Sequence, residues 1–481
     1  MHRPCYCTRV HFSAHFCQCY FLAIQRFQML NLLHYRADQI VSSAATRIVL
    51  SLVYAAVVFV AYRWYLHHNW KIYGFEFFPP SAITFAAVAV LISLQAAVLP
   101  HYIDRASGLF VSLVYVLVIV PTLVVTALLT EYSFSQHAPS LLAMTAGFCL
   151  CCHIARSGPQ PTGKQISSVP LESLIAVFFS IATVVLFYQH HAILSWAPPD
   201  APYEQRALGR ASGAVLAYTR TYYLNVACPG LFAFGLLKRN YLYLAAALGG
   251  FVLNYLIDAQ RTALCMPVVM TILFLALCSN WRPLRSNSLL ILLSATGLAA
   301  SYLLYQHLLL YGQSQFIILR TIGLPGLALS SYAETFSGER LTWWSHVRGI
   351  SMFVPKPIEL LSDPNWPQLG LIVGRHMIGY ENFNYNAHFF ASDGVAAAGW
   401  MGILAVSVVF AAWLKLLDYC SSGWDIRLVI LLMSPLTMVV LNAPLFTTLA
   451  SFGGLFWPIT LYVFSENRFR SLWPRLRPHR S

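Results

Sequence analysis

Long apolar segments are the feature that most constrains how this chain can fold. A helix needs about 20 mostly apolar residues to cross a bilayer, and the chain holds a series of such segments separated by polar turns. Only 10% of its 481 residues are charged, whereas a soluble domain has about 25%. The sequence therefore predicts an all-α polytopic membrane protein. The expected spans lie near 48–66, 82–100, 108–130, 138–155, 170–188, 212–237, 240–257, 261–279, 288–311, 394–414, 427–443 and 446–464.

The positions of lysine and arginine predict how these spans are oriented. Short loops rich in Lys and Arg stay on the cytoplasmic side, and Arg105, Arg156, Lys238 and Arg282 fall in alternate loops. We therefore expect about 12 spans, with both termini in the cytoplasm and a large outer loop between the ninth and tenth. The expected parts are an N-terminal tail at 1–47, spans at 48–311, the loop at 312–393, spans at 394–464 and a basic tail at 465–481.

The first residues are unusually rich in cysteine. The stretch CYCTRVHFSAHFCQC has two C-x-C pairs flanking two histidines. A zinc site there is an alternative, but the spacing fits none of the common zinc-binding patterns. A second alternative is that translation starts at Met29. The large loop contains no cysteine and so carries no disulfide. We expect no metal and no cofactor.

The net charge of +13 could suggest a polyanionic partner. In a polytopic protein such an excess is typical of cytoplasmic loops that face anionic lipid. No run of basic residues is interleaved with aromatic residues as in a nucleic-acid groove. We therefore expect the lipid bilayer, and no nucleic acid, as the partner of these charges.

A polar cluster lies where the large loop meets the tenth expected span, in NFNYNAHFFASDGVAAAGWMG. Polar groups this close to lipid are costly, which makes them candidates for a functional site. The alternatives are a solvated loop, a structural histidine, and an aspartate that caps the next helix. The candidates for sugar binding are Asn382, Asn384, Asn386 and Tyr380, and those for proton transfer are His388 and Asp393.

Arginine is frequent on the expected outer face, where positive charge should be scarce. The planar guanidinium group suits bidentate phosphate recognition and stays charged at working pH. The alternatives are that each arginine anchors lipid headgroups or pairs with Asp258, Glu339 or Glu359. The candidates for binding a diphosphate are Arg220, Arg261, Arg320, Arg340 and Arg375.

Four stretches occur in a familiar order: AYTRTYYLNVACPGLFAFGLLKRN, NYLIDAQRTALCMPVV, LRTIGLPGLALSSYAETFS and NAHFFASDGVAAAGWMGILAVS. Together they resemble the Wzy-type oligosaccharide repeat-unit polymerases of bacteria over about 212–464. The first five spans match that family in hydropathy alone. Arg261 is followed by Thr262 where many relatives have Lys or Arg followed by Ser, and His388 is not established as a shared position.

The resemblance implies a membrane glycosyltransferase of the C type in the bacterial inner membrane. It would transfer a glycan from one undecaprenyl diphosphate to another lipid-linked repeat unit, without a nucleotide sugar. The family's outer-face arginines correspond to Arg220, Arg261 and Arg320, and its polar segment to Asn386 and Asp393. A chain-length regulator is an expected partner.

Three other functions share part of this pattern. An O-antigen-type ligase would use the same donor and the same membrane face. A lipid-linked glycan flippase or other transporter would place charges along a path through the membrane, whereas polar residues here gather at one face. An acyltransferase would use a histidine on the cytoplasmic side, for which His153 is the candidate.

Within the large loop, Leu327–Phe336 and Trp343–Phe353 are expected to form interfacial helices.

Overall fold

The computed structural model describes residues 38–161, 163–197, 202–210, 213–308, 315–379 and 383–465. Regular structure in these ranges is helical, with no β-strand and two isolated bridges. Eight of the described helices are long and apolar enough to cross a membrane, or nine if one bent pair counts as a single span. This confirms the predicted all-α membrane protein. The cysteine-rich N-terminal stretch, Tyr380, Asn382 and the basic C-terminal tail lie outside the described residues.

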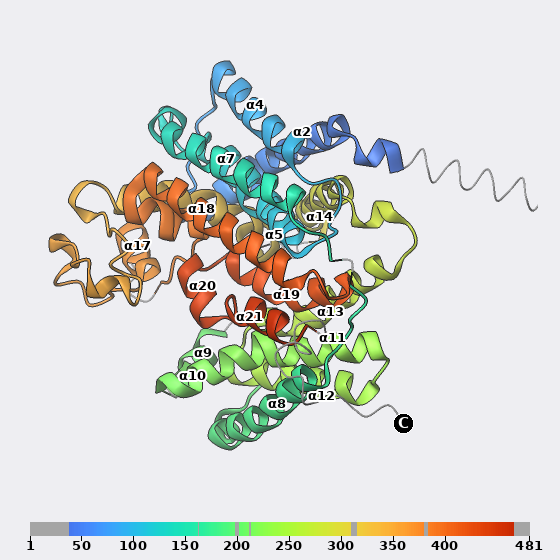
Figure 1. Cartoon of the computed structure of the whole chain (residues 1–481). Coiled ribbons are helices and arrows are strands. Elements are labelled where there is room, and N and C mark those ends of the chain that lie inside the picture. The colour runs from blue at the N-terminus through green and yellow to red at the C-terminus, as the bar shows by residue number, and fades with distance from the viewer. Residues whose placement is uncertain are drawn as a thin grey trace, which may run out of the picture.

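The helices fall into three groups along the chain (Figure 1). The first contains α2 (Ala44–Ala61), α3 (His67–Trp70), α4 (Ala82–Val98), α5 (Ala106–Val114), α6 (Val120–Thr126) and α7 (Ser133–Ser157). The second contains α8 (Val169–His190), α9 (Pro202–Arg210), α10 (Gly213–Tyr222), α11 (Cys228–Lys238), α12 (Tyr241–Asp258) and α13 (Arg261–Cys278). The third contains α14 (Asn287–Leu308), α16 (Leu324–Thr335), α17 (Leu369–Ile378), α18 (Ala396–Ser421), α19 (Ile426–Val440), α20 (Leu445–Ser451) and α21 (Phe456–Val463).

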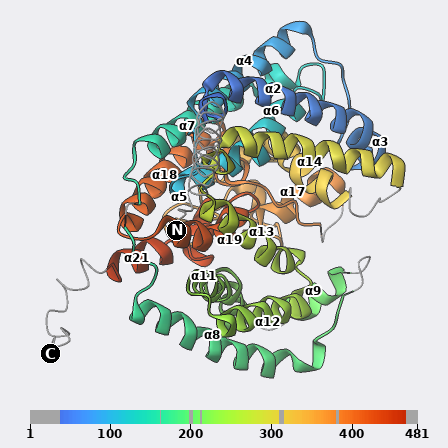
Figure 2. The same ribbon diagram turned by 90° about the vertical axis from the view of Figure 1, so that its right-hand side faces the viewer.

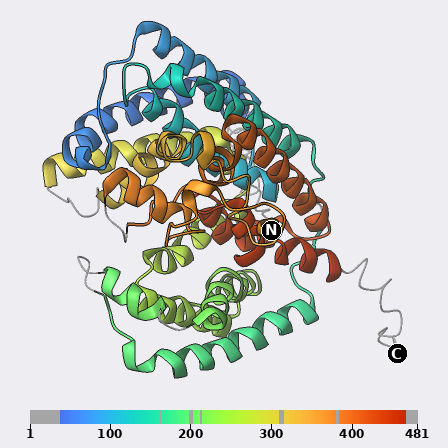
Figure 3. The same cartoon turned by 90° about the vertical axis from the view of Figure 1, so that its left-hand side faces the viewer.

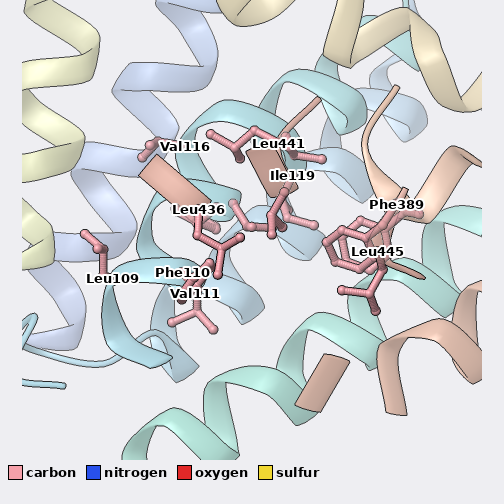
Figure 4. Packing of buried hydrophobic residues seen from close by; sticks show 14 of the residues in the cluster. Leu109, Phe110, Val111, Val116, Ile119, Phe389, Leu436, Leu441 and Leu445 are labelled. Atoms are coloured by element: carbon pink, nitrogen blue, oxygen red, sulfur yellow. The ribbon is translucent and has the colours of Figure 1, made fainter. Parts of the chain in front are cut away.

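The C-terminal helices lie between the two N-terminal groups. In Figure 1, α2, α4 and α7 lie above α18 to α21, and α8, α10 and α12 lie below them. The turned views show the same arrangement (Figures 2 and 3). The segment Ala106–Thr126 is central, because 89% of its most apolar window is buried. Its side chains pack with residues of α19 and α20, as Leu109, Phe110, Ile119, Leu436 and Leu445 do in Figure 4.

Polar side chains define where several helices begin. Ser43 accepts a hydrogen bond from the Thr46 N–H at 3.0 Å at the start of α2, and Asn240 accepts one from the Leu242 N–H at 3.0 Å at the start of α12. Ser, Thr, Asn and Asp are the residues that cap helix N-termini in this way. These caps determine the residue at which each helix begins, which hydropathy alone does not define.

Wide π-helical turns interrupt several of the long helices. The turns are η1 (Tyr62–Leu66), η3 (Tyr115–Ile119), η5 (Tyr223–Ala227), η7 (Gln315–Gly323) and η11 (Phe390–Val395). Three of them, η3, η5 and η7, are followed by a helix with proline as its second residue: Pro121, Pro229 and Pro325. Proline lacks an N–H group and its ring clashes with the carbonyl four residues earlier. A wider turn at that point keeps the chain helical through the proline.

The segment Leu327–Phe336 differs from its expected interfacial position. It forms most of α16, and ten of the twelve residues of this helix are buried. Thr122 on α6 donates a hydrogen bond to the Pro325 carbonyl at 3.3 Å. The segment therefore belongs to the packed interior. The second segment, Trp343–Phe353, consists of turns and one short 3₁₀ helix.

Candidate functional site

A sharp backbone break follows the polar cluster. Near the start of α18, Ala398 has φ −151° and ψ 31°, and Gly399 has φ 59° and ψ −138°. A Cβ atom placed on Gly402 would lie 2.1 Å from the Gly394 carbonyl oxygen. η11 therefore folds back against the beginning of α18, a hairpin that only glycine permits at Gly399 and Gly402. We call the segment Phe390–Gly402 the hairpin.

Asp393 lies in η11, the first part of this hairpin, and is fully buried. Its Oδ1 atom is 3.2 Å from the Nε2 atom of His346. Its Oδ2 atom accepts a hydrogen bond from the Phe446 N–H at 3.2 Å. Phe446 lies in the first turn of α20, where backbone N–H groups have no partner within the helix. The carboxylate thus caps α20, a helix 53 residues further along the chain, rather than the helix that follows it.

His346 was missed by the sequence reasoning. Its side chain is only 5% exposed, and its Nδ1 atom lies 2.9 Å from the hydroxyl oxygen of Thr342. Both ring nitrogens therefore have polar partners, one a hydroxyl and one a carboxylate. This pattern of a base oriented by a carboxylate is typical of general acid–base sites. No local motif announces it, because His346 and Asp393 are 47 residues apart in the sequence.

The backbone around His346 is fixed to the hairpin. The N–H groups of Thr342 and Trp343 donate to the carbonyls of Ala396 and Ala397 at 2.9 and 3.0 Å. Trp343 and Trp344 both have left-handed backbone conformations, with φ 46° and 62°. Such a conformation costs about 1–2 kcal/mol in a residue other than glycine. The surrounding contacts hold two such residues in a row, and this turn presents the His346 ring to Asp393.

His388, the histidine expected to transfer protons, has a different environment. It is 1% exposed. Its Nε2 atom lies 3.3 Å from the Pro325 carbonyl oxygen, and its Nδ1 atom accepts from the Ala391 N–H at 3.4 Å. Burial lowers the pKa of His388 to about 4. A neutral ring with two backbone partners fits the structural alternative better than a base.

Replacing His388 by glutamine tests this structural role. A histidine whose pKa is lowered by folding binds a proton more readily in the unfolded state, so it destabilises the fold as the pH falls. The window lies between its ordinary pKa of 6.5 and about 4. We expect the thermal midpoint of the wild type in detergent to fall more steeply between pH 7 and 5 than that of His388→Gln. Loss of activity with unchanged stability would instead assign His388 to catalysis.

Arginines gather at the turn between α12 and α13. The Arg220 guanidinium is 3.6 Å from the Asp258 carboxylate and donates to the Gly209 carbonyl at 3.0 Å. Arg206 donates to the Ala259 carbonyl at 3.4 Å, and Arg261 is the first residue of α13. The turn 258–261 thus brings two of the expected diphosphate-binding arginines to one place, together with Arg206. We call Arg206, Arg220 and Arg261 the arginine cluster.

The pairing of Arg220 with Asp258 is one of the alternatives raised by the sequence. A buried ion pair holds a guanidinium in place and reduces its net charge. The Asp258 carboxylate, only 2% exposed, pairs with Arg220, whereas Arg206 contacts the backbone of the same turn and Arg261 begins the next helix, so the net charge of the cluster remains positive. This arrangement can bind an anion while keeping the arginines oriented.

The remaining candidate arginines are more dispersed. Arg340 pairs with Glu359, both being 42% exposed, and Arg375 pairs with Asp363. The exposed Arg340–Glu359 pair contributes little to stability, whereas the Asp363 carboxylate that holds Arg375 is only 5% exposed. Arg320 lies exposed on η7. No described contact joins Arg320, Arg340 or Arg375 to the arginine cluster.

Helix α10 connects the arginine cluster with His346. Tyr218, two residues before Arg220, accepts a hydrogen bond from Arg348 at 3.3 Å. Tyr222 donates to the Ala450 carbonyl on α20 at 3.4 Å, the same helix that Asp393 caps. The loop that carries His346 and Arg348 therefore meets α10, the hairpin and α20 at one end of the molecule. In Figure 1, α17 and the neighbouring loop lie at this edge.

The asparagines expected to bind sugar lie beside the hairpin. Asn384 and Asn386 are exposed, whereas Tyr385 between them is buried and its N–H donates to the Gly370 carbonyl at 2.8 Å. Two exposed amides therefore flank a buried anchor. Within the described part of the chain, no group of three His, Cys, Asp or Glu side chains could hold a metal ion.

Comparison with known proteins gives no relative: no family model, curated protein or solved structure matches the chain.

Proposed function

We propose that the protein is a membrane glycosyltransferase that polymerises oligosaccharide repeat units carried on a polyprenyl diphosphate. The observation that carries this proposal is the buried His346–Asp393 pair at 3.2 Å, connected through α10 to the arginine cluster. Transfer from a lipid diphosphate requires a base for the acceptor hydroxyl and positive charge for the leaving group. This end of the molecule supplies both.

The proposed reaction assigns a role to each group. His346 takes the proton of the acceptor hydroxyl, whose oxygen bonds to the anomeric carbon as the bond to the diphosphate breaks. Nδ1 is the nitrogen for this step, because Nε2 faces Asp393, and the acceptor would replace the Thr342 hydroxyl at that position. Asp393 stabilises the resulting imidazolium ion. The arginine cluster stabilises the departing diphosphate, and Asn384 and Asn386 bind sugar hydroxyls.

The proposal also includes a topology. The helix ends around the loop and hairpin would face the periplasm across the bacterial inner membrane. About 12 spans would then place both termini in the cytoplasm, counting α4, α19 and the α10–α11 segment as spans. The basic residues at the opposite end support this orientation. There, for example, Arg47 donates to the Ala96 carbonyl at 3.1 Å and Arg156 to the Leu99 carbonyl at 2.9 Å.

Analysis of lipid-linked glycans in a deletion strain tests the proposed function. A polymerase predicts that single repeat units accumulate on undecaprenyl diphosphate and that the wild-type gene restores polymer. A ligase predicts polymer that remains on the lipid without being transferred. A flippase predicts that repeat units accumulate on the cytoplasmic face of the membrane. A glycosidase added to the periplasmic side would then not cleave them. Either of the last two outcomes would overturn the proposal.

Replacing Arg261 by alanine should lower polymer formation. Loss of one donor that stabilises charge in the transition state costs on the order of 10²–10³ in rate. The measurement is polymer formed by equal amounts of purified protein in vesicles. Lys415→Ala is the matched control, because it removes one exposed positive charge near the other end of α18. Arg320→Ala tests a predicted diphosphate-binding arginine that lies apart from the arginine cluster. Wild-type rates for Arg261→Ala would remove the diphosphate role of that residue.

A further inference from the structure

Arg348 is distinguished from its neighbours by its partner. Arg220, Arg340 and Arg375 each pair with a carboxylate. Arg348 is exposed, and it donates to the neutral Tyr218 hydroxyl at 3.3 Å, while none of the ion pairs among the described residues includes it. Its charge is therefore uncompensated at rest, while its orientation is already fixed by a hydrogen bond.

The position of Arg348 relates it to the acceptor rather than to the donor diphosphate. It follows His346 by two residues, so the two Cα atoms are at most about 7 Å apart. A sugar whose hydroxyl contacts the proposed base would therefore lie within reach of the arginine side chain. The arginine cluster proposed for the diphosphate includes Arg220, which follows Tyr218 by two residues on α10, and no described contact joins Arg348 to that cluster.

The turn that carries His346 also presents an aromatic surface. Trp343 is 51% exposed, although it has an apolar ring and a backbone with φ 46°. The hydrogen bond from its N–H to the Ala397 carbonyl at 3.0 Å holds it in this conformation. An exposed indole ring maintained at such a cost suits the face of a sugar ring next to the base. The turn thus combines a base, an aromatic face and a cation.

We propose that Arg348 is a specificity-determining residue that binds a carboxylate on the acceptor sugar, so that the protein prefers acidic repeat units such as those ending in a uronic acid. The planar fork of arginine matches a carboxylate in a bidentate manner. The Tyr218 hydroxyl accepts from the guanidinium and would be a neighbouring donor for the same carboxylate. This inference rests on the proposed glycosyl transfer and adds the chemical class of the acceptor.

The test uses purified protein in vesicles with a lipid-linked donor and two matched acceptors, one ending in glucuronic acid and one in glucose. We expect the wild type to prefer the acidic acceptor. In Arg348→Gln, kcat/KM for the acidic acceptor should fall about 10- to 100-fold, as for a lost hydrogen bond to a charged group, with less than about threefold change for the neutral one. Lys356→Gln, which removes another cation of the same loop, is the control.

The outcomes separate this inference from the proposed function. If the wild type transfers neither acceptor, the proposed glycosyl transfer fails. If it transfers both equally, or if Arg348→Gln leaves a preference intact, only the assignment of Arg348 fails. Inorganic pyrophosphate added as a competitor gives a further readout. It should inhibit Arg348→Gln and the wild type at the same concentration, and weaker inhibition of the variant would assign Arg348 to the diphosphate instead.

Discussion

Replacing His346 by glutamine is expected to abolish most polymer formation while leaving the protein folded. Glutamine keeps an amide donor for the buried Asp393 carboxylate but cannot take up a proton. General base catalysis contributes roughly 10²–10⁴ in rate, so the variant should lose a factor of this size. The measurement is kcat with purified protein in vesicles, together with the thermal midpoint in detergent. The midpoint should stay close to that of the wild type.

Asp393→Asn provides the control that separates capping from proton transfer. Asparagine keeps an oxygen that accepts from the Phe446 N–H, so the cap on α20 survives. Its amide group cannot hold the His346 imidazolium, and it favours the wrong tautomer of the ring. We therefore expect a loss of activity comparable to that of His346→Gln. Full activity in Asp393→Asn would leave the carboxylate with a structural role alone and would remove the pair from the mechanism.

Replacing Gly402 by alanine should disrupt the same site through the backbone. The new methyl group would lie 2.1 Å from the Gly394 carbonyl oxygen, closer than any packing allows. Either η11 or the start of α18 must move, and overpacking of this kind costs about 1–3 kcal/mol. Since Gly394 is next to Asp393, the movement displaces the carboxylate from His346. We expect lower thermal stability and an activity loss of at least about tenfold, larger than the loss of folded protein explains.

Gly297 offers a matched control for this substitution. It lies on α14, and a Cβ atom placed there meets nothing within 4 Å. Alanine is the better helix former, so Gly297→Ala should leave the midpoint unchanged or raise it slightly. If Gly402→Ala behaved like Gly297→Ala, the close approach of η11 to the start of α18 would not be a feature of the working protein.

Hydropathy was sufficient to predict an all-α membrane protein, because a span is a local property of about 20 residues. Of the twelve predicted spans, eight or nine described helices are long and apolar enough to cross a membrane. Hydropathy was insufficient for the hairpin. The run GVAAAGWMG reads as the start of one apolar helix, and nothing in its composition shows that Ala398 and Gly399 leave the helical conformation. The interior position of α16 was hidden for the same reason. Hydropathy does not distinguish an apolar helix at the membrane surface from one packed between other helices.

The candidate site, too, was predicted only in part from the sequence. Asp393 was found because a charge beside an apolar segment is costly wherever it lies. Its partner His346 was not found, because their contact depends on the path of the intervening loop. Arg220 and Arg261 are separate charges in the sequence. Arg220 reaches the turn 258–261 through Asp258 because α9, which accepts from Arg220 at Gly209, packs on the end of α12. Residue types indicated candidate residues, whereas tertiary contacts decide which of these candidates lie together.

The π-helical turns have a consequence for how one membrane segment can do two tasks. Each α-helical residue turns the chain by about 100°, so a turn that holds an extra residue rotates everything after it by roughly that angle. In the segment from Gly213 to Lys238, the half before η5 points Tyr218 and Arg220 toward the polar end of the molecule. The half after it buries Cys228 through Gly235 against the other helices. A single extra residue thus lets one segment present polar side chains at one end and an apolar, buried face at the other, without a loop between the two.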